Sequence, residues 1–167
     1  TVLSRGLGDV YKRQELIQGA LDQKIDSATM KEAFHYFETY YHKNCLANST
    51  LYPGVLEALK KFESHGVKMT VFTNKPQKYT DFILKELEVD HLFLKVIGSY
   101  AEYPMKPDSK GTLALFDVMQ LHACDVLMVG DTDVDLHTGQ QVGMDVALVD
   151  YGYWTPEEVQ AIADQAN

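Results

Sequence analysis

Three acidic residues follow an apolar run in the segment VLMVGDTDVDL, residues 126–136. Asp131 and Asp135 offer hard oxygen donors of the kind that Mg²⁺ takes alongside water and substrate phosphate. Asp133 is expected instead to cap the helix that follows. Carboxylates gathered in one site repel one another unless a cation compensates them. The segment therefore predicts a divalent-cation site at the end of a buried strand.

Two further segments carry side chains that suit an anionic ligand. In VFTNK, Thr73 and Asn74 can donate hydrogen bonds to an anionic oxygen, and a helix starting after them would add free backbone N–H groups. In YPMKPD, Lys106 can act as a point charge beside a phosphate and nearby carboxylates. Each of these residue types is common in turns and on surfaces, so the specific signal is their combination and order along the chain.

These side chains must be positioned by a fold in which strands and helices alternate. The residue pattern predicts helices at about 15–23, 28–46, 54–65, 76–88, 109–121, 133–142 and 155–166, and strands at about 67–73, 95–97, 125–130 and 145–149. Strict alternation from residue 54 onward predicts an α/β fold with a doubly wound, mostly parallel, Rossmann-like sheet and helices on both faces. Ligands of such sheets bind beyond the carboxyl ends of the strands, where the polar residues above are expected to lie.

Composition limits the classes of partner. With 167 residues, 46% hydrophobic and 23% charged, the chain is sized for one well-buried soluble domain and a small appendage. A net charge of -9 argues against nucleic-acid binding, because no basic surplus is available to neutralise phosphates. No apolar run reaches membrane length and no signal peptide is recognisable. We therefore expect a cytoplasmic protein with neither a nucleic-acid nor a membrane partner.

Cysteine, histidine and aromatic residues are interpreted structurally. Cys45 and Cys124 are far apart and without metal-ligand spacing, which predicts reduced buried thiols. The six histidines share no spacing and are expected at structural or surface positions. Aromatic residues recur within the predicted helix 28–46 and indicate a helix-packing face: Phe34, Tyr36, Phe37, Tyr40 and Tyr41.

The first segment, TVLSRGLGDVYKRQ, has no helical or strand period and resembles a translated junction sequence. We expect residues 1–14 to be a non-native junction segment, with a native loop and first helical turn as the alternative.

Three motifs together resemble a known superfamily. VFTNK, MKPD and VGDTDVDLHTGQQVGM are similar to the second, third and fourth motifs of the haloacid dehalogenase-like hydrolases. Within that superfamily, YPGVLEALKKF, TNKP and the closing DYGY most resemble phosphoglycolate phosphatases. The resemblance covers residue 15 to the C-terminus. It implies a Mg²⁺-dependent phosphatase that hydrolyses a small phosphate monoester, such as 2-phosphoglycolate, through a phosphoaspartyl intermediate, as a monomer or homodimer.

The resemblance also implies a role for each matching residue. Thr73 would hold the transferring phosphoryl group, and Asn74 would assist it. Lys106 would steady the nucleophile and the phosphate charge, so that Thr73 and Lys106 are the expected catalytic residues. Asp131 would bind Mg²⁺, and Asp135 would bind it directly or through water.

One motif of the superfamily is missing. Its apolar strand ending in Asp-x-Asp-Gly, which supplies the nucleophile, should precede the helical cap, and the nearest string here is GLGDV, whose Asp9 follows no strand. We therefore expect residues 15–49 to be a partial helical cap and residues 50–167 to be a hydrolase core without its first strand. The neighbours of that strand would lose a hydrogen-bonding partner. The chain as written is expected to be a fragment without phosphatase activity.

Other functions are left open by the sequence. The same superfamily includes enzymes for other substrates, such as pyrophosphate or a sugar phosphate that is isomerised, and a non-catalytic phosphate- or metal-binding relative is a further alternative. A phosphate-accepting receiver domain uses similar residue types, but its acidic cluster precedes the threonine and lysine. Here Asp131 and Asp135 follow Lys106, which counts against that class.

Overall fold

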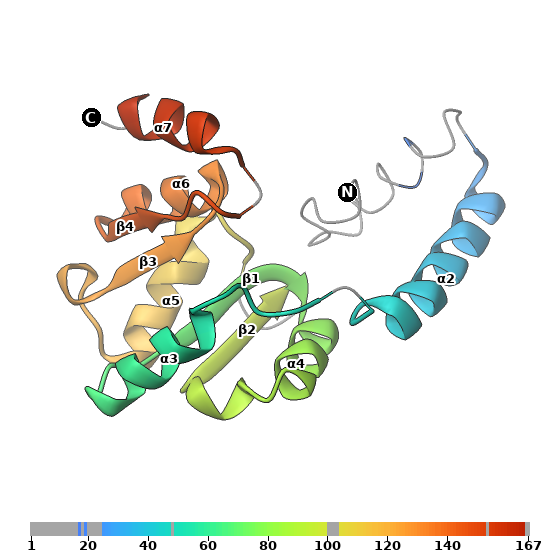
Figure 1. The fold of residues 1–167 in the computed structure, drawn as a ribbon. Helices are drawn as coiled ribbons and strands as arrows, with labels where there is room; N and C mark the ends of the chain where they lie inside the picture. The colour runs from blue at the N-terminus through green and yellow to red at the C-terminus, as the bar shows by residue number, and fades with distance from the viewer. Residues whose placement is uncertain are drawn as a thin grey trace. The chain divides into compact units, whose positions relative to one another are not determined.

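The computed structural model describes residues 17, 19, 25–47, 49–99, 104–152 and 154–165. The predicted junction segment 1–14 lies outside them. The chain divides into two compact units, Thr1–Ala101 and Glu102–Asn167. In chain order the described elements of the first unit are α2 (Ser27–Asn44), α3 (Val55–Ser64), β1 (Thr70–Pro76), α4 (Gln77–Glu86), the 3₁₀ helix η2 (Asp90–Leu92) and β2 (Lys95–Ser99) (Figure 1). Those of the second unit are α5 (Ser109–Met119), the 3₁₀ helix η3 (Ala123–Asp125), β3 (Leu127–Gly130), α6 (Asp133–Val142), β4 (Asp145–Leu148) and α7 (Pro156–Gln165).

The first unit is built on a parallel pair of strands. β1 and β2 pair in regular register from Thr70 opposite Lys95 to Phe72 opposite Ile97, and the register then shifts before Pro76 meets Ser99. α4 packs against both strands and buries Tyr79 and Thr80. Apolar burial there holds the end of β1 against the start of α4.

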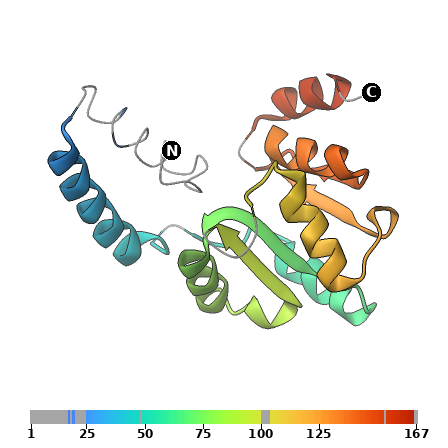
Figure 2. The same ribbon diagram turned by 180° about the vertical axis from the view of Figure 1, so that it is seen from behind.

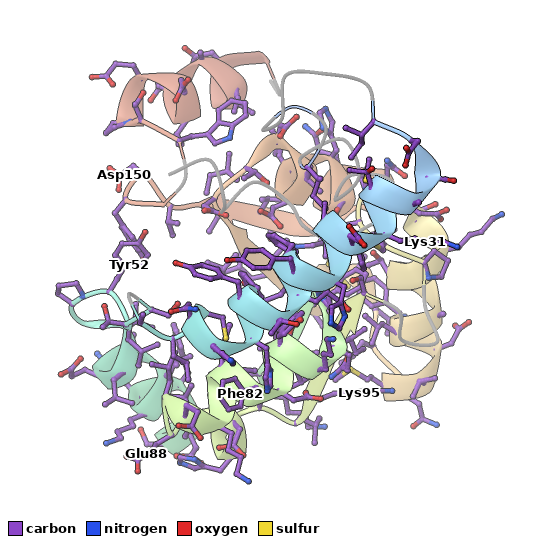
Figure 3. All side chains as sticks on the ribbon, turned by 90° about the vertical axis from the view of Figure 1, so that its right-hand side faces the viewer. Lys31, Tyr52, Phe82, Glu88, Lys95 and Asp150 are labelled. Atoms are coloured by element: carbon purple, nitrogen blue, oxygen red, sulfur yellow. The ribbon has the colours of Figure 1, made fainter. Side chains whose placement is uncertain are left out.

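Helix α2 begins at a side-chain cap and contacts α4 through aromatic rings. Asp26 Oδ1 accepts hydrogen bonds from the N–H groups of Ala28 and Thr29 at 3.0 and 2.8 Å, which satisfies two amides without helical partners. The ring of His42 lies 5.7 Å from that of Phe82 on α4, which is labelled in Figure 3. Because none of the residues of α2 is fully buried, these ring contacts are its main described packing.

The predicted aromatic face is confirmed for two rings and wrong for two others. Phe37 stacks on Tyr41 at a centroid distance of 5.7 Å, and Tyr41 meets Tyr79 edge-on at 4.8 Å. Tyr36 and Tyr40 are 75% and 56% exposed. Each directly precedes one of the contacting rings, so its side chain points to a different side of the helix.

The second unit contains a second parallel pair. β3 and β4 pair from Leu127 opposite Asp145 to Gly130 opposite Leu148, and α6 packs against both strands (Figure 2). Gly139 permits a close approach, since a Cβ there would lie 2.2 Å from Cγ2 of Val146 on β4. On β3, Leu127 and Val129 are 59% and 60% exposed.

The predicted alternation of helices with parallel strands is confirmed, with two differences. The described strands form two pairs instead of one sheet, so that β1 and β3 each have a single described partner. The absence of the superfamily's first strand stays a prediction. β1 also starts later than predicted and continues through Pro76, which places Thr73 and Asn74 within the strand instead of after it.

Smaller expectations have mixed outcomes. Both cysteines are free, but only Cys45 is buried and Cys124 is exposed. All six histidines are exposed, as expected for surface residues: His35, His42, His65, His91, His122 and His137. Across the described part of the chain, we find no helix with the length and apolarity needed to cross a membrane. The division into a cap at 15–49 and a core at 50–167 stays a prediction.

Candidate functional site

A buried ion pair forms the centre of the site in the second unit. Lys106 Nζ donates to Oδ1 of Asp135 at 2.5 Å, and the two side chains are only 10% and 8% exposed. The other carboxylate oxygen of Asp135 accepts hydrogen bonds from the N–H groups of Asp131 and Thr132, both at 3.2 Å, and from the Thr132 hydroxyl at 3.0 Å. A buried charge needs such compensation, because desolvation otherwise costs several kcal/mol. Both oxygens of Asp135 are therefore satisfied within the protein.

The same carboxylate starts helix α6. Thr132 is the N-cap residue, and Asp135 is the acidic partner of a capping box that reaches back to the Thr132 N–H. Asp133 is the first residue of the helix, so the expectation that it caps the helix is wrong. Asp135 thus combines helix capping with the pairing of Lys106.

Asp131, at the end of β3, is held by close backbone packing. Burial, and secondly the charge of Asp135, raise the pKa of Asp131 above its ordinary value, while Lys106 opposes the shift. A Cβ on Gly152 would lie 2.3 Å from Cβ of Asp131, and one on Gly130 would lie 2.2 Å from Cβ of Asp135. Only glycine fits at either position, so the two acidic side chains can occupy their places only because their neighbours have no side chain.

The carboxylates of this region have the chemistry of cation ligands but do not form a complete set. Within the described ranges, no group of three or more His, Cys, Asp and Glu side chains is arranged to hold a metal ion. Both oxygens of Asp135 already take part in internal hydrogen bonds, which makes Asp135 a weaker candidate for a metal ligand. The pKa of Asp131 is raised first by burial and secondly by the charge of Asp135, and a bound cation would oppose both effects.

The first unit presents hydrogen-bond donors near the end of β1. The Thr73 hydroxyl accepts a hydrogen bond from the Lys75 N–H at 3.2 Å, and its own proton stays available to a ligand. Helix α4 follows directly, and its N-cap Pro76 makes no side-chain capping hydrogen bond. Free amides at a helix start attract anions. Lys75 Nζ, finally, donates to the phenol oxygen of Tyr41 at 2.7 Å.

The structure brings together Lys106, Asp131 and Asp135 within the second unit, and their roles at a phosphate or metal site stay a prediction. Thr73 and Asn74 are half-buried in the first unit, and their convergence with the acidic residues stays a prediction. The sequence analysis assigned no role to Lys75 and interpreted Tyr41 only as a packing residue. No local pattern links these two, because they are 34 positions apart. Tyr153 and residues 100–103 of the predicted loops lie outside the described residues.

Comparison with known proteins identifies the class. A model of the haloacid dehalogenase-like hydrolase family matches residues 12–149, which is most of the chain. The chain belongs to this family. The order of Thr73, Lys106 and Asp131 along it is the order in which the family's motifs were expected.

Individual relatives carry a more specific name than the family. The chain is 33% identical over 133 residues to a phosphoglycolate phosphatase of Photobacterium profundum, covering 80% of this chain and 58% of the relative. It is 31% identical over 135 residues to a phosphoglycolate phosphatase of Rhodospirillum rubrum, covering 81% and 56% respectively. The chain thus spans little more than half the length of these curated relatives.

Solved structures share the fold. A crystal structure described as a predicted phosphoglycolate phosphatase from Haemophilus somnus 129pt is similar with a TM-score of 0.84 and 27% identity, covering 93% of this chain and 70% of that one. A haloacid dehalogenase-like family hydrolase from Streptococcus pneumoniae has a TM-score of 0.72 at 18% identity, covering 92% and 74%. The predicted Rossmann-like α/β class is confirmed by these neighbours.

Proposed function

We propose that the whole protein is a phosphatase that hydrolyses a small phosphate monoester such as 2-phosphoglycolate. The observation that supports this most is the buried Lys106–Asp135 pair beside Asp131, which brings an ammonium group next to two carboxylates. The phosphoglycolate phosphatases among the relatives point to the substrate class. The partner would be a small phosphorylated metabolite in the cytoplasm.

Each residue of this chain would contribute a defined interaction. Asp131 would ligate Mg²⁺, which when bound would neutralise charge on the phosphoryl oxygens. The role of Asp135 as a ligand, directly or through water, stays a prediction, and its four hydrogen bonds favour a role in positioning Asp131 and Lys106. The Thr73 hydroxyl and the first amides of α4 would donate to the phosphoryl group, with Asn74 assisting. Lys106 would balance the charge of the phosphate and the nucleophile.

The nucleophile would come from an Asp-x-Asp-Gly strand that the 167 residues do not contain ahead of α2. Transfer of the phosphoryl group from the monoester to its aspartate would break the ester P–O bond, release the alcohol and form a phosphoaspartyl intermediate. Water would then hydrolyse this intermediate to inorganic phosphate and the free aspartate. We therefore infer that the chain as written has no phosphatase activity.

The experiment compares two proteins with Mg²⁺ and p-nitrophenyl phosphate. The pure chain is expected to give no turnover. A longer protein, read from the source DNA upstream of residue 15 and containing the Asp-x-Asp-Gly strand, is expected to turn over the substrate. Asp131→Asn in the longer protein should abolish that turnover. Activity of the short chain would refute the missing nucleophile, and an inactive longer protein would refute the phosphatase function.

A further inference from the structure

Lys75 is a half-buried cation with an unusual partner. Its ammonium donates to the Tyr41 hydroxyl at 2.7 Å and lies 5.5 Å from the centre of that ring. Among the residues that the structure describes, no carboxylate lies within ion-pair distance of it, although the chain has 24 acidic residues. A phenol orients an ammonium without neutralising it. The positive charge of Lys75 is therefore fixed in place but not compensated by these residues.

Lys78, three residues further on, shows the ordinary arrangement. Its ammonium pairs with Glu38 of α2 at 3.3 Å, lies 4.6 Å from the ring centre of Tyr79, and is 60% exposed. Both lysines reach the same face of α2, Lys75 from the end of β1 and Lys78 from the first turn of α4. Only Lys78 has a described acidic partner, so the absence of one at Lys75 is a feature of that position and not of the whole contact.

The donors at Lys75 fit a carboxylate. The ammonium carries three protons, of which Tyr41 takes one, and the phenol keeps its own proton to donate. An anion bound to the ammonium would also be within reach of this phenol, because the two groups are in hydrogen-bond contact. A carboxylate has two oxygens and can accept from both donors at once.

The position of the pair connects it to the predicted phosphate site. The Lys75 N–H donates to the Thr73 hydroxyl at 3.2 Å, so this hydroxyl lies against the backbone of Lys75. With the uncapped start of α4, Thr73 would hold a phosphoryl group, which leaves Lys75 and Tyr41 for another anionic group of the same small molecule.

We propose that Lys75 and Tyr41 form a subsite for the carboxylate of a small phosphate monoester, and so select substrates that carry a second negative group. This inference rests on the proposed phosphatase function, because it presupposes that the phosphate binds at Thr73. It adds a contact between the predicted cap segment and the substrate, since Tyr41 belongs to α2.

The test measures binding to the 167-residue chain by NMR titration with Mg²⁺ present. The two probes are 2-phosphoglycolate and ethyl phosphate, which has the phosphate but no carboxylate. We expect 2-phosphoglycolate to bind about tenfold more tightly, which corresponds to about 1.4 kcal/mol. Lys75→Met should remove this preference and leave the affinity for ethyl phosphate unchanged. Tyr41→Phe should reduce the preference severalfold, and Lys75→Arg should retain most of it.

Lys78→Met is the matched control, because it removes a neighbouring cation from the same contact, and it should leave both affinities unchanged. Equal binding of the two probes to the unmodified chain would overturn the subsite while leaving the phosphate site intact. A Lys75→Met variant that loses affinity for both probes equally would also overturn it, because Lys75 would then contact the phosphate. Failure of ethyl phosphate to bind at all, with 2-phosphoglycolate still bound through Lys75, would refute the phosphate site at Thr73 instead. Binding of neither probe would refute both.

Discussion

The two units of the chain hold their key lysines in opposite ways. Lys106 in the second unit is buried and paired with Asp135, whose remaining hydrogen bonds also come from the protein. Lys75 in the first unit is half-buried, and its described side-chain partner is a neutral phenol. The difference teaches that a salt bridge both positions an ammonium group and neutralises its charge. A phenol positions the ammonium group without neutralising it, so that an anionic ligand can still pair with the charge. Lys106 should therefore matter more for stability and Lys75 more for recognition.

The largest expected loss of stability follows from replacing Lys106. Lys106→Met leaves the Asp135 carboxylate buried without its counter-ion, which should lower the free energy of unfolding by about 3–5 kcal/mol. Urea denaturation followed by circular dichroism measures this loss. Lys75→Met should cost less than about 1 kcal/mol, because no described charge is left unpaired. Equal losses in the two variants would contradict the comparison.

A surface pair provides the reference for these variants. Lys78→Met breaks the pair of an exposed lysine with Glu38, and should change the free energy of unfolding by about 0–1 kcal/mol. A loss as large as that expected for Lys106→Met would show that the measurement reports general damage.

The second prediction concerns how closely the acidic site is packed. Gly152→Ala would place a methyl group 2.3 Å from Cβ of Asp131, which should lower stability by about 1–3 kcal/mol through overpacking. In a double-mutant cycle, Asp131→Gly should remove most of that loss, because the opposing side chain is gone. Additive losses would mean that the two residues do not contact each other in solution.

A smaller effect is expected at Tyr41. Tyr41→Phe removes the hydroxyl that Lys75 contacts but keeps the ring against Tyr79, so stability should fall by about 0.5–1 kcal/mol. Thermal unfolding measures the change. A loss above about 2 kcal/mol would show that the hydroxyl is mainly structural, which would weaken its assignment to a ligand.

The smallest effect is the pH dependence due to Asp131. Because its pKa is raised in the folded chain, the folded state binds more protons than the unfolded state from about pH 4 upward until the raised pKa is passed. Stability due to this group therefore falls as the pH rises through that window. Asp131→Asn should remove the penalty and make the chain without Mg²⁺ slightly more stable at pH 7, with no gain below about pH 4. A gain that persists in acid would refute this cause.

Much of the fold is encoded in local patterns. The helix Asp133–Val142 agrees with its predicted bounds, because Gly143, at a φ of 75°, ends it in the left-handed conformation that favours glycine. The start of β1 was placed too early, since Val67 belongs to a β-prone run but is 50% exposed. The end of β1 was placed too early as well, because its extension depends on Pro76 meeting Ser99 of another strand.

The site was predictable in its residue types but not in its pairings. The order of Thr73, Lys106 and Asp131 pointed to the family. The sequence could not show that the carboxylate oxygens of Asp135 accept hydrogen bonds from Lys106 and from the start of α6. These contacts depend on how the first turn of the helix folds back. Nor could it show that Gly152 lies against Asp131, since this contact joins two loops 21 positions apart.

The exposed side chains of Leu127 and Val129 have a practical consequence. Both lie on β3, where alternate residues share one face, and β3 has a single described neighbour. An apolar strand whose edge has no described partner can pair with strands of other chains. We expect concentrated solutions of the purified chain to aggregate, and we expect Val129→Lys to reduce this aggregation.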